Sequence, residues 1–145
     1  MRNFPFELKA YPKPTSLPRP IINIDFKNPN DKRKILKVIG IIDTGADYCT
    51  IPLNLQSQLG LDLKNMGANT IGVSCACGNK AFFGYGYKLN VTAYDTANKP
   101  FTNLLSVHFV PSDTFPLIGR NFMELFKGVS YITKEKKGYF YSGTS

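Results

Sequence analysis

Apolar and polar residues alternate along much of this chain in the manner of short, half-buried strands. The alternation is clearest over residues 19–26 and 104–110, where apolar side chains recur at every second position. Residues 35–42 are largely apolar, which is typical of a buried strand. Turn-forming residues at 28–33 separate this run from the first strand. The pattern therefore predicts that the first unit is a β-hairpin ending at residue 42.

The rest of the chain adds further short strands and two brief helical segments. Residues 52–60 are expected to form one or two helical turns, with proline at the first position and glycine at the last. Strands are expected at 70–74 and 80–92, and apolar spacing over 121–126 predicts a short helix. A last strand covers residues 129–133. The sequence thus predicts a mostly β fold with one short C-terminal helix.

The pattern divides the chain into an arm, a single domain and a short tail. Residues 1–20 contain five of the ten prolines and show no periodicity, so an extended arm is expected there. The arm is either disordered or lies along the domain or across a partner subunit. Residues 21–141 form the domain and residues 142–145 the tail. A chain of 145 residues is long enough for one sizeable core.

Composition narrows the functional classes. A membrane helix needs about 18 consecutive apolar residues, and the chain has no such run, so no membrane partner is expected. Its first residues lack the apolar core of a signal peptide, and three cysteines make a poor disulfide framework, so a cytoplasmic location is expected. The formal net charge is +8, but the basic residues are spread over turns without an RNA-binding or recognition-helix pattern. No nucleic-acid partner is expected.

Cys75 and Cys77, which are one residue apart, form half of a candidate metal site. The only further soft ligands are Cys49 and His108, and no second closely spaced pair of cysteines accompanies them. Small side chains in a hairpin are therefore the favoured interpretation, and neither a metal nor a cofactor is expected.

The stretch over residues 39–52 breaks its own local pattern. An apolar strand stops at the acidic residue Asp43, which is followed by Thr44 and Gly45. A carboxylate next to a buried strand is costly unless it is hydrogen-bonded, and glycine permits the tight turn that brings amide donors to it. Such breaks in local consistency tend to mark functional sites.

Three motifs in this order resemble those of the retropepsin-like aspartic proteases, and the resemblance covers about residues 19–133. The first is Asp43-Thr44-Gly45-Ala46-Asp47, and the second is a glycine-containing hairpin in the middle of the chain. The third is the segment Leu-Ile-Gly-Arg-Asn at 117–121, which comes before the expected helix. The opening at 19–24 is similar to the first strand of cellular and bacterial single-domain members of this group.

The resemblance implies a single-domain acid-protease barrel that is active as a two-fold homodimer. Peptide hydrolysis without a metal needs both a base to activate water and an acid to protonate the leaving amine. Two close carboxylates that share one proton supply both. The chain contains one Asp-Thr-Gly only, since Asp95 and Asp113 precede threonines without a following glycine. Water would therefore be activated between two Asp43 carboxylates, one from each subunit.

Further roles follow from the resemblance alone. Thr44, Gly45 and Ala46 would support the active site, and Asp47 would bind substrate and pair with Arg120. The alternative for that pair is a purely structural role. The tip of a substrate-covering flap is placed at Ser74, Cys75, Ala76, Cys77, Gly78 and Asn79, with residues 66–70 as the other candidate. Apolar residues 81–83 favour a peptide or protein substrate with apolar residues near the scissile bond.

Two other functional hypotheses compete with an aspartic endopeptidase. One is a catalytically silent module of the same fold that binds peptides or mediates dimerisation. The intact Asp-Thr-Gly argues against it, because a binding module has no need for a paired acid that costs stability. The other is a basic nucleic-acid-binding barrel, which the dispersed charge disfavours.

Overall fold

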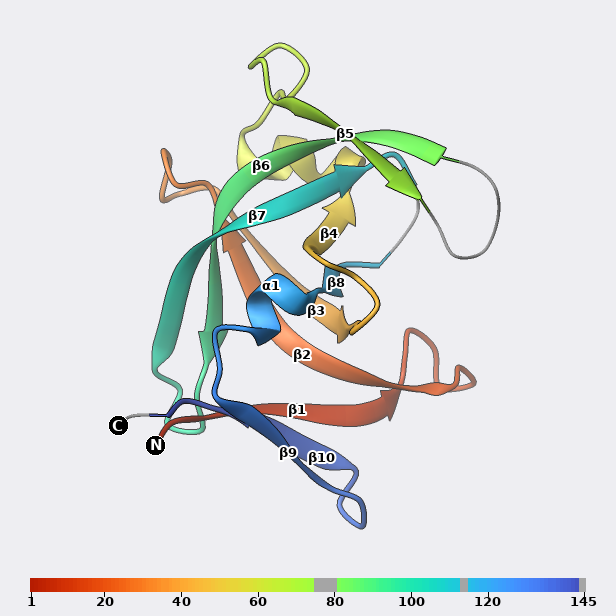
Figure 1. The fold of residues 1–145 in the computed structure, drawn as a ribbon, viewed down its shortest axis with the longest axis vertical. Coiled ribbons are helices and arrows are strands. Elements are labelled where there is room, and N and C mark those ends of the chain that lie inside the picture. The colour runs from red at the N-terminus through yellow and green to blue at the C-terminus, as the bar shows by residue number, and fades with distance from the viewer. Residues whose placement is uncertain (75–80, 113–114, 144–145) are drawn as a thin grey trace.

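A computed structural model describes residues 1–74, 81–112 and 115–143, and it consists mainly of strands (Figure 1). The elements in chain order are β1 (Asn3–Ala10), β2 (Pro18–Lys27), β3 (Ile35–Ile42), β4 (Cys49–Pro52), the 3₁₀ helix η1 (Leu53–Leu59), β5 (Asn69–Ser74), β6 (Ala81–Tyr94), β7 (Pro100–Val110), β8 (Leu117–Ile118), the helix α1 (Arg120–Met123), β9 (Gly128–Ile132) and β10 (Lys137–Tyr141). The expected mostly β fold is confirmed. No helix in the described ranges is long and apolar enough to cross a membrane.

The strands form one sheet that curls back on itself. Their order is β5-β6-β7-β4-β8-β3-β2-β1-β10-β9, and β6 also pairs with β2. The long strands β6 and β7 arch over the middle of the molecule, while β1, β9 and β10 lie together at its lower end (Figure 1). Most neighbours are antiparallel, but β3 pairs with β8, and β4 with β7, in parallel. These two parallel pairs lie at the centre of the sheet, where the candidate site is built.

The core follows the apolar alternation. Ile24 and Phe26 of β2 are 1% and 0% exposed, and Val107 and Phe109 of β7 are both 0% exposed. Burial of one such side chain contributes about 1.5–3 kcal/mol to folding. Phe122 of α1 is 1% exposed and packs into the same core. The short helix is therefore fastened by its apolar side, as its spacing predicted.

The segment expected as an arm differs from that expectation because it belongs to the sheet. Strand β1 lies between β10 and β2, and Phe4 is 1% exposed. Strand β2 begins at Pro18, so it runs through the expected boundary at residue 20. The N-terminal segment thus lies along the body of its own chain. At the C-terminal end, the Ser142 amide donates to the Arg2 carbonyl, which joins the two ends.

A clasp around Asp95 holds the N-terminal strand. Its carboxylate accepts hydrogen bonds from the Ala97 and Lys99 amides, and Arg2 Nε donates to Oδ2 over 2.8 Å. The Arg2 guanidinium also lies over the Phe4 ring, 5.0 Å from its centroid. The Lys99 amide and the Arg2 side chain lower the pKa of Asp95 below its ordinary value of 3.8.

The clasp predicts a pH-dependent stability. Because the folded state favours ionised Asp95, its contribution is fully present above pH 3.8 and is lost as the pH falls through the lower folded pKa. Asp95→Asn should therefore lower the free energy of unfolding at neutral pH, and the difference from the unsubstituted protein should shrink in strong acid. Urea unfolding over a pH series measures it. Glu124→Gln, which changes an exposed carboxylate, is the control. A difference that does not vary with pH would contradict the prediction.

Candidate functional site

Asp43 lies at the end of two paired central strands. Ile41 and Ile42 of β3 run parallel to Leu117 and Ile118 of β8, and the Asp43 amide donates to the Ile118 carbonyl over 3.0 Å. Asp43 therefore lies at the end of a central strand of the sheet, where its carboxylate is accessible to solvent. Asp43 itself is partly exposed, while Thr44 and Gly45 are exposed.

The turn after Asp43 is closed by its own carboxylate. Oδ1 accepts a hydrogen bond from the Gly45 amide over 2.9 Å, and the Ala46 amide donates to the Asp43 carbonyl over 3.2 Å. A Cβ atom at position 45 would lie 3.2 Å from the same Oδ1. Glycine thus allows the amide to approach without crowding the carboxylate. The sequence predicted this turn from the residue types alone.

The second motif fastens the turn from behind. The Arg120 amide donates to the Ala46 carbonyl over 2.8 Å, and the Asn121 amide donates to the Asp47 carbonyl over 3.1 Å. Gly119 lies against the backbone of Tyr48, and a Cβ atom at position 119 would be 2.5 Å from the Tyr48 carbonyl carbon and oxygen. The glycine of the second motif is therefore required by close backbone approach.

Asn121 links three segments through its side chain. Its Oδ1 accepts a hydrogen bond from the Cys49 amide over 3.0 Å, and its Nδ2 donates to the Ser106 carbonyl over 2.8 Å. Sequence reasoning noted the Arg-Asn pair but assigned this asparagine no role. The signal was present, because an asparagine side chain can accept and donate at once and so bridge two backbones.

An ion pair joins Asp47 and Arg120, as the resemblance implied. Arg120 Nη2 contacts Asp47 Oδ1, and the two side chains are 56% and 63% exposed, respectively. An exposed pair of this kind contributes about 1 kcal/mol or less to stability. Both charged groups are therefore accessible to a ligand, and their role in substrate binding stays a prediction.

Burial sets the chemistry of the residues that follow. Cys49 is fully buried, and this burial raises the pKa of its thiol to about 11, so the thiol is not a nucleophile at neutral pH. Tyr48 stacks on His108 with the ring centroids 4.3 Å apart. Burial lowers the pKa of His108 below 6.5, which favours its neutral form. Sequence reasoning considered His108 only as a metal ligand and missed the stack.

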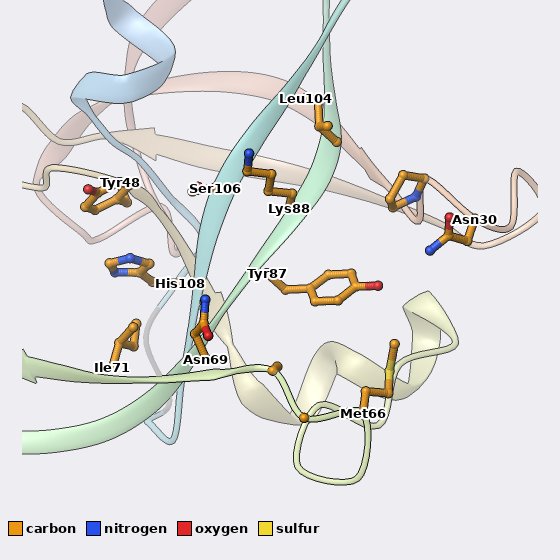
Figure 2. Close-up of a pocket in the computed structure, with 14 residues that line it drawn as sticks. Asn30, Tyr48, Met66, Asn69, Ile71, Tyr87, Lys88, Leu104, Ser106 and His108 are labelled. Atoms are coloured by element: carbon orange, nitrogen blue, oxygen red, sulfur yellow. The ribbon is translucent and has the colours of Figure 1, made fainter.

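A cavity of about 680 Å³ opens beside Tyr48 (Figure 2). It lies between the paired strands β6 and β7 on one side and residues 66–71 on the other. Its lining consists of Pro29, Asn30, Tyr48, Met66, Gly67, Ala68, Asn69, Ile71, Gly86, Tyr87, Lys88, Leu104, Ser106 and His108. Tyr48, which follows the Asp43 turn in the chain, lies at one side of the cavity, and the cavity extends from there along β5 and β6.

The predicted flap tip can be placed only in part. Strand β5 ends at Ser74, and the other five residues of that prediction, 75–79, lie outside the described residues. The alternative tip at 66–70 includes a turn in which Gly67 has φ = +69°, followed by the start of β5. Phe83 on β6 is 73% exposed. Within the described ranges, no three His, Cys, Asp or Glu side chains are grouped as a metal would require.

The fit at Gly119 generates a prediction. Gly119→Ala should destabilise the protein by about 1–3 kcal/mol, because its new methyl group meets backbone atoms that must move. The displaced turn should also lower any activity that depends on Asp43. Gly72→Ala is the matched control, since a Cβ there has no neighbour within 4 Å among the described residues. Thermal and urea unfolding of both variants measures the difference. Equal stability of the two would show that the turn is not held as described.

Comparison of the sequence with models of protein families and with curated proteins found no match. Comparison of the structure found a retropepsin-like aspartic protease from Rickettsia conorii with a TM-score of 0.61 and 21% sequence identity, covering 94% of this chain and 89% of that one. EIAV protease bound to the inhibitor HBY-793 was also found, with a TM-score of 0.42, 15% identity and coverage of 73% and 86%. The latter is too distant to add to the argument. The chain has the retropepsin-like aspartic protease fold, as shown by its similarity to the Rickettsia conorii structure and by the order of its strands and turns.

Proposed function

We propose that this chain is an aspartic endopeptidase that acts as a homodimer, with Asp43 of each subunit forming the catalytic pair. The observation that carries the proposal is the Asp43 turn. Its carboxylate is partly exposed, closed by the Gly45 amide, and fixed at the ends of two central strands. A fold resembling that of an aspartic protease over 94% of the chain supports the same conclusion.

A second chain is needed because one carboxylate cannot complete the reaction. Within the described residues, the Asp43 carboxylate has a hydrogen bond from Gly45 and no ion pair. The sequence offers no second Asp-Thr-Gly. Thr44 and Gly45 are exposed, so the turn is accessible to the same turn of a second copy. A two-fold axis next to Asp43 would bring the two carboxylates together.

The two carboxylates divide the chemistry. At close range they cannot both be ionised, so they hold one proton between them. The ionised carboxylate takes a proton from water, and the oxygen of that water attacks the substrate carbonyl. The protonated carboxyl group donates its proton to the amine that leaves when the C–N bond breaks. Thr44 would hold the two turns together across the axis, and Asp47 with Arg120 would orient the substrate backbone. The β5–β6 hairpin would cover a substrate with apolar residues near the scissile bond.

The sheet limits how two copies can be joined. Strands β1 and β10 each have strands of their own chain on both sides, so neither offers a free edge to a second copy. In the described part of the chain, β9 ends the sheet with one free edge, and Val129 and Tyr131 on it are 57% and 43% exposed. We therefore include this edge in the proposed dimer surface. A cytoplasmic location belongs to the same proposal, supported by the buried free thiol of Cys49.

The decisive test is cleavage of an unbiased peptide library from acidic to neutral pH. Asp43→Asn should lower kcat/KM by about three orders of magnitude or more, because it removes both the base and the shared proton. Activity per chain should fall on dilution as the dimer dissociates. Asp31→Asn, in the turn between β2 and β3, is the matched control and should cleave normally.

The outcomes separate the proposal from its alternative. Cleavage that survives Asp43→Asn would exclude this carboxylate as the catalytic group. If protein shown by ultracentrifugation to be dimeric binds peptides but cleaves none at any pH, the chain is a catalytically silent binding module of the same fold.

A further inference from the structure

We infer that the cavity beside Tyr48 is a specificity pocket for an acidic side chain of the substrate, with Lys88 as the recognising charge. This inference rests on the proposed function, since it assigns a substrate class to the same site. Tyr48 directly follows Asp47, to which the proposed function assigns substrate binding, and Tyr48 lines the cavity.

The strand register gathers the groups that form the pocket wall. Lys88 of β6 lies opposite Ser106 of β7, and Gly86 lies opposite His108. Because side chains alternate along a strand, Lys88, Ser106 and His108 share one face of this pair. Figure 2 shows Lys88, Ser106, His108 and Tyr48 in the same part of the cavity.

Gly86 keeps the floor of the pocket open. A Cβ atom there would meet Ile71 at 3.5 Å and His108 at 4.0 Å, which are ordinary contact distances. The glycine is therefore not required by packing against its neighbours. Because Gly86 has no side chain, it leaves free volume in the cavity between Ile71 of β5 and His108 of β7.

The charges of the lining favour an anion. Lys88 is the one Lys or Arg among the fourteen residues that line the cavity, and none of them is Asp or Glu. Asn30, Asn69, Tyr87 and Ser106 add neutral hydrogen-bond donors. Within the described residues Lys88 has no ion pair, so its ammonium group is available to a ligand. A carboxylate entering here would gain a charge-assisted hydrogen bond, whereas a cationic side chain would be repelled.

The occupant is one side chain of an extended peptide, and this gives the pocket a positional signature. A peptide held as an added strand turns successive side chains to opposite faces, so a single substrate position enters this cavity. General attraction to a protein of net charge +8 would instead favour acidic residues at every position. The two explanations therefore differ in how acidic preference is distributed along the peptide.

The experiment measures binding so that it does not depend on cleavage. Immobilised full-length Asp43→Asn protein is incubated with an unbiased peptide library, and retained peptides are sequenced by mass spectrometry. We expect Asp and Glu to be enriched over Asn and Gln by about fivefold at one position, as for a partly exposed ion pair. Adding Lys88→Glu should replace that preference with Lys and Arg, and adding Lys88→Gln should abolish it.

Lys134→Glu is the matched control, because this exposed lysine lies in the β9–β10 turn and changes net charge equally. Thermal unfolding verifies that each variant is folded. Acidic enrichment at one position that Lys88→Glu reverses and Lys134→Glu leaves supports the inference, even if the unsubstituted protein cleaves nothing. Enrichment spread over all positions, equal loss in both variants, or retention of no peptide would overturn it. Cleavage by the unsubstituted protein tests the proposed function separately.

Discussion

The structure depends on backbone hydrogen bonds that hold the Asp43 turn against the start of α1. The Asp43 amide donates to Ile118, and the Arg120 amide donates to Ala46, so the turn is fastened at both ends. Gly119 makes this approach possible because no side chain separates it from Tyr48. The attachment uses main-chain groups. Leaving such a group unpaired in a protein interior costs its full desolvation free energy. The carboxylate is therefore presented at the surface by a turn that has little freedom to move.

Most of the fold could be predicted from the sequence because its strands are amphipathic. Strands β2 and β7 were expected from alternation, and their apolar faces are buried. The N-terminal strand was missed because its prolines drew attention away from the alternation of Phe4, Phe6 and Leu8. Proline removes one amide donor, yet alternate residues of a strand point their amides to different neighbours, so β1 still pairs on both sides. The high proline content of this segment thus concealed the alternation of a strand that pairs with β10.

The candidate site divides into a part that local sequence determines and a part that it does not. The turn at Asp43 follows from adjacent residues, and the segment around Gly119 is a recognisable second motif. The cavity wall depends on which residue of β6 faces which residue of β7, and no local signal pairs Lys88 with Ser106. The ring contact between Tyr48 and His108 joins residues that are sixty positions apart in the sequence. Such contacts follow from register, which tertiary packing sets and a single sequence does not display.

This division has a consequence for how the site can work. The geometry that chemistry needs is fixed by main-chain bonds, so it does not depend on the side chains that line the cavity. Those side chains come from the exposed face of β6 and β7, where Lys88 contributes charge and Gly86 contributes space. Substitution on this face would therefore alter the proposed substrate selectivity without loosening the Asp43 turn. Tyr48 belongs to both parts, since its backbone packs on Gly119 and its ring lines the cavity. Tyr48 is therefore the residue at which the cavity meets the segment that follows the Asp43 turn.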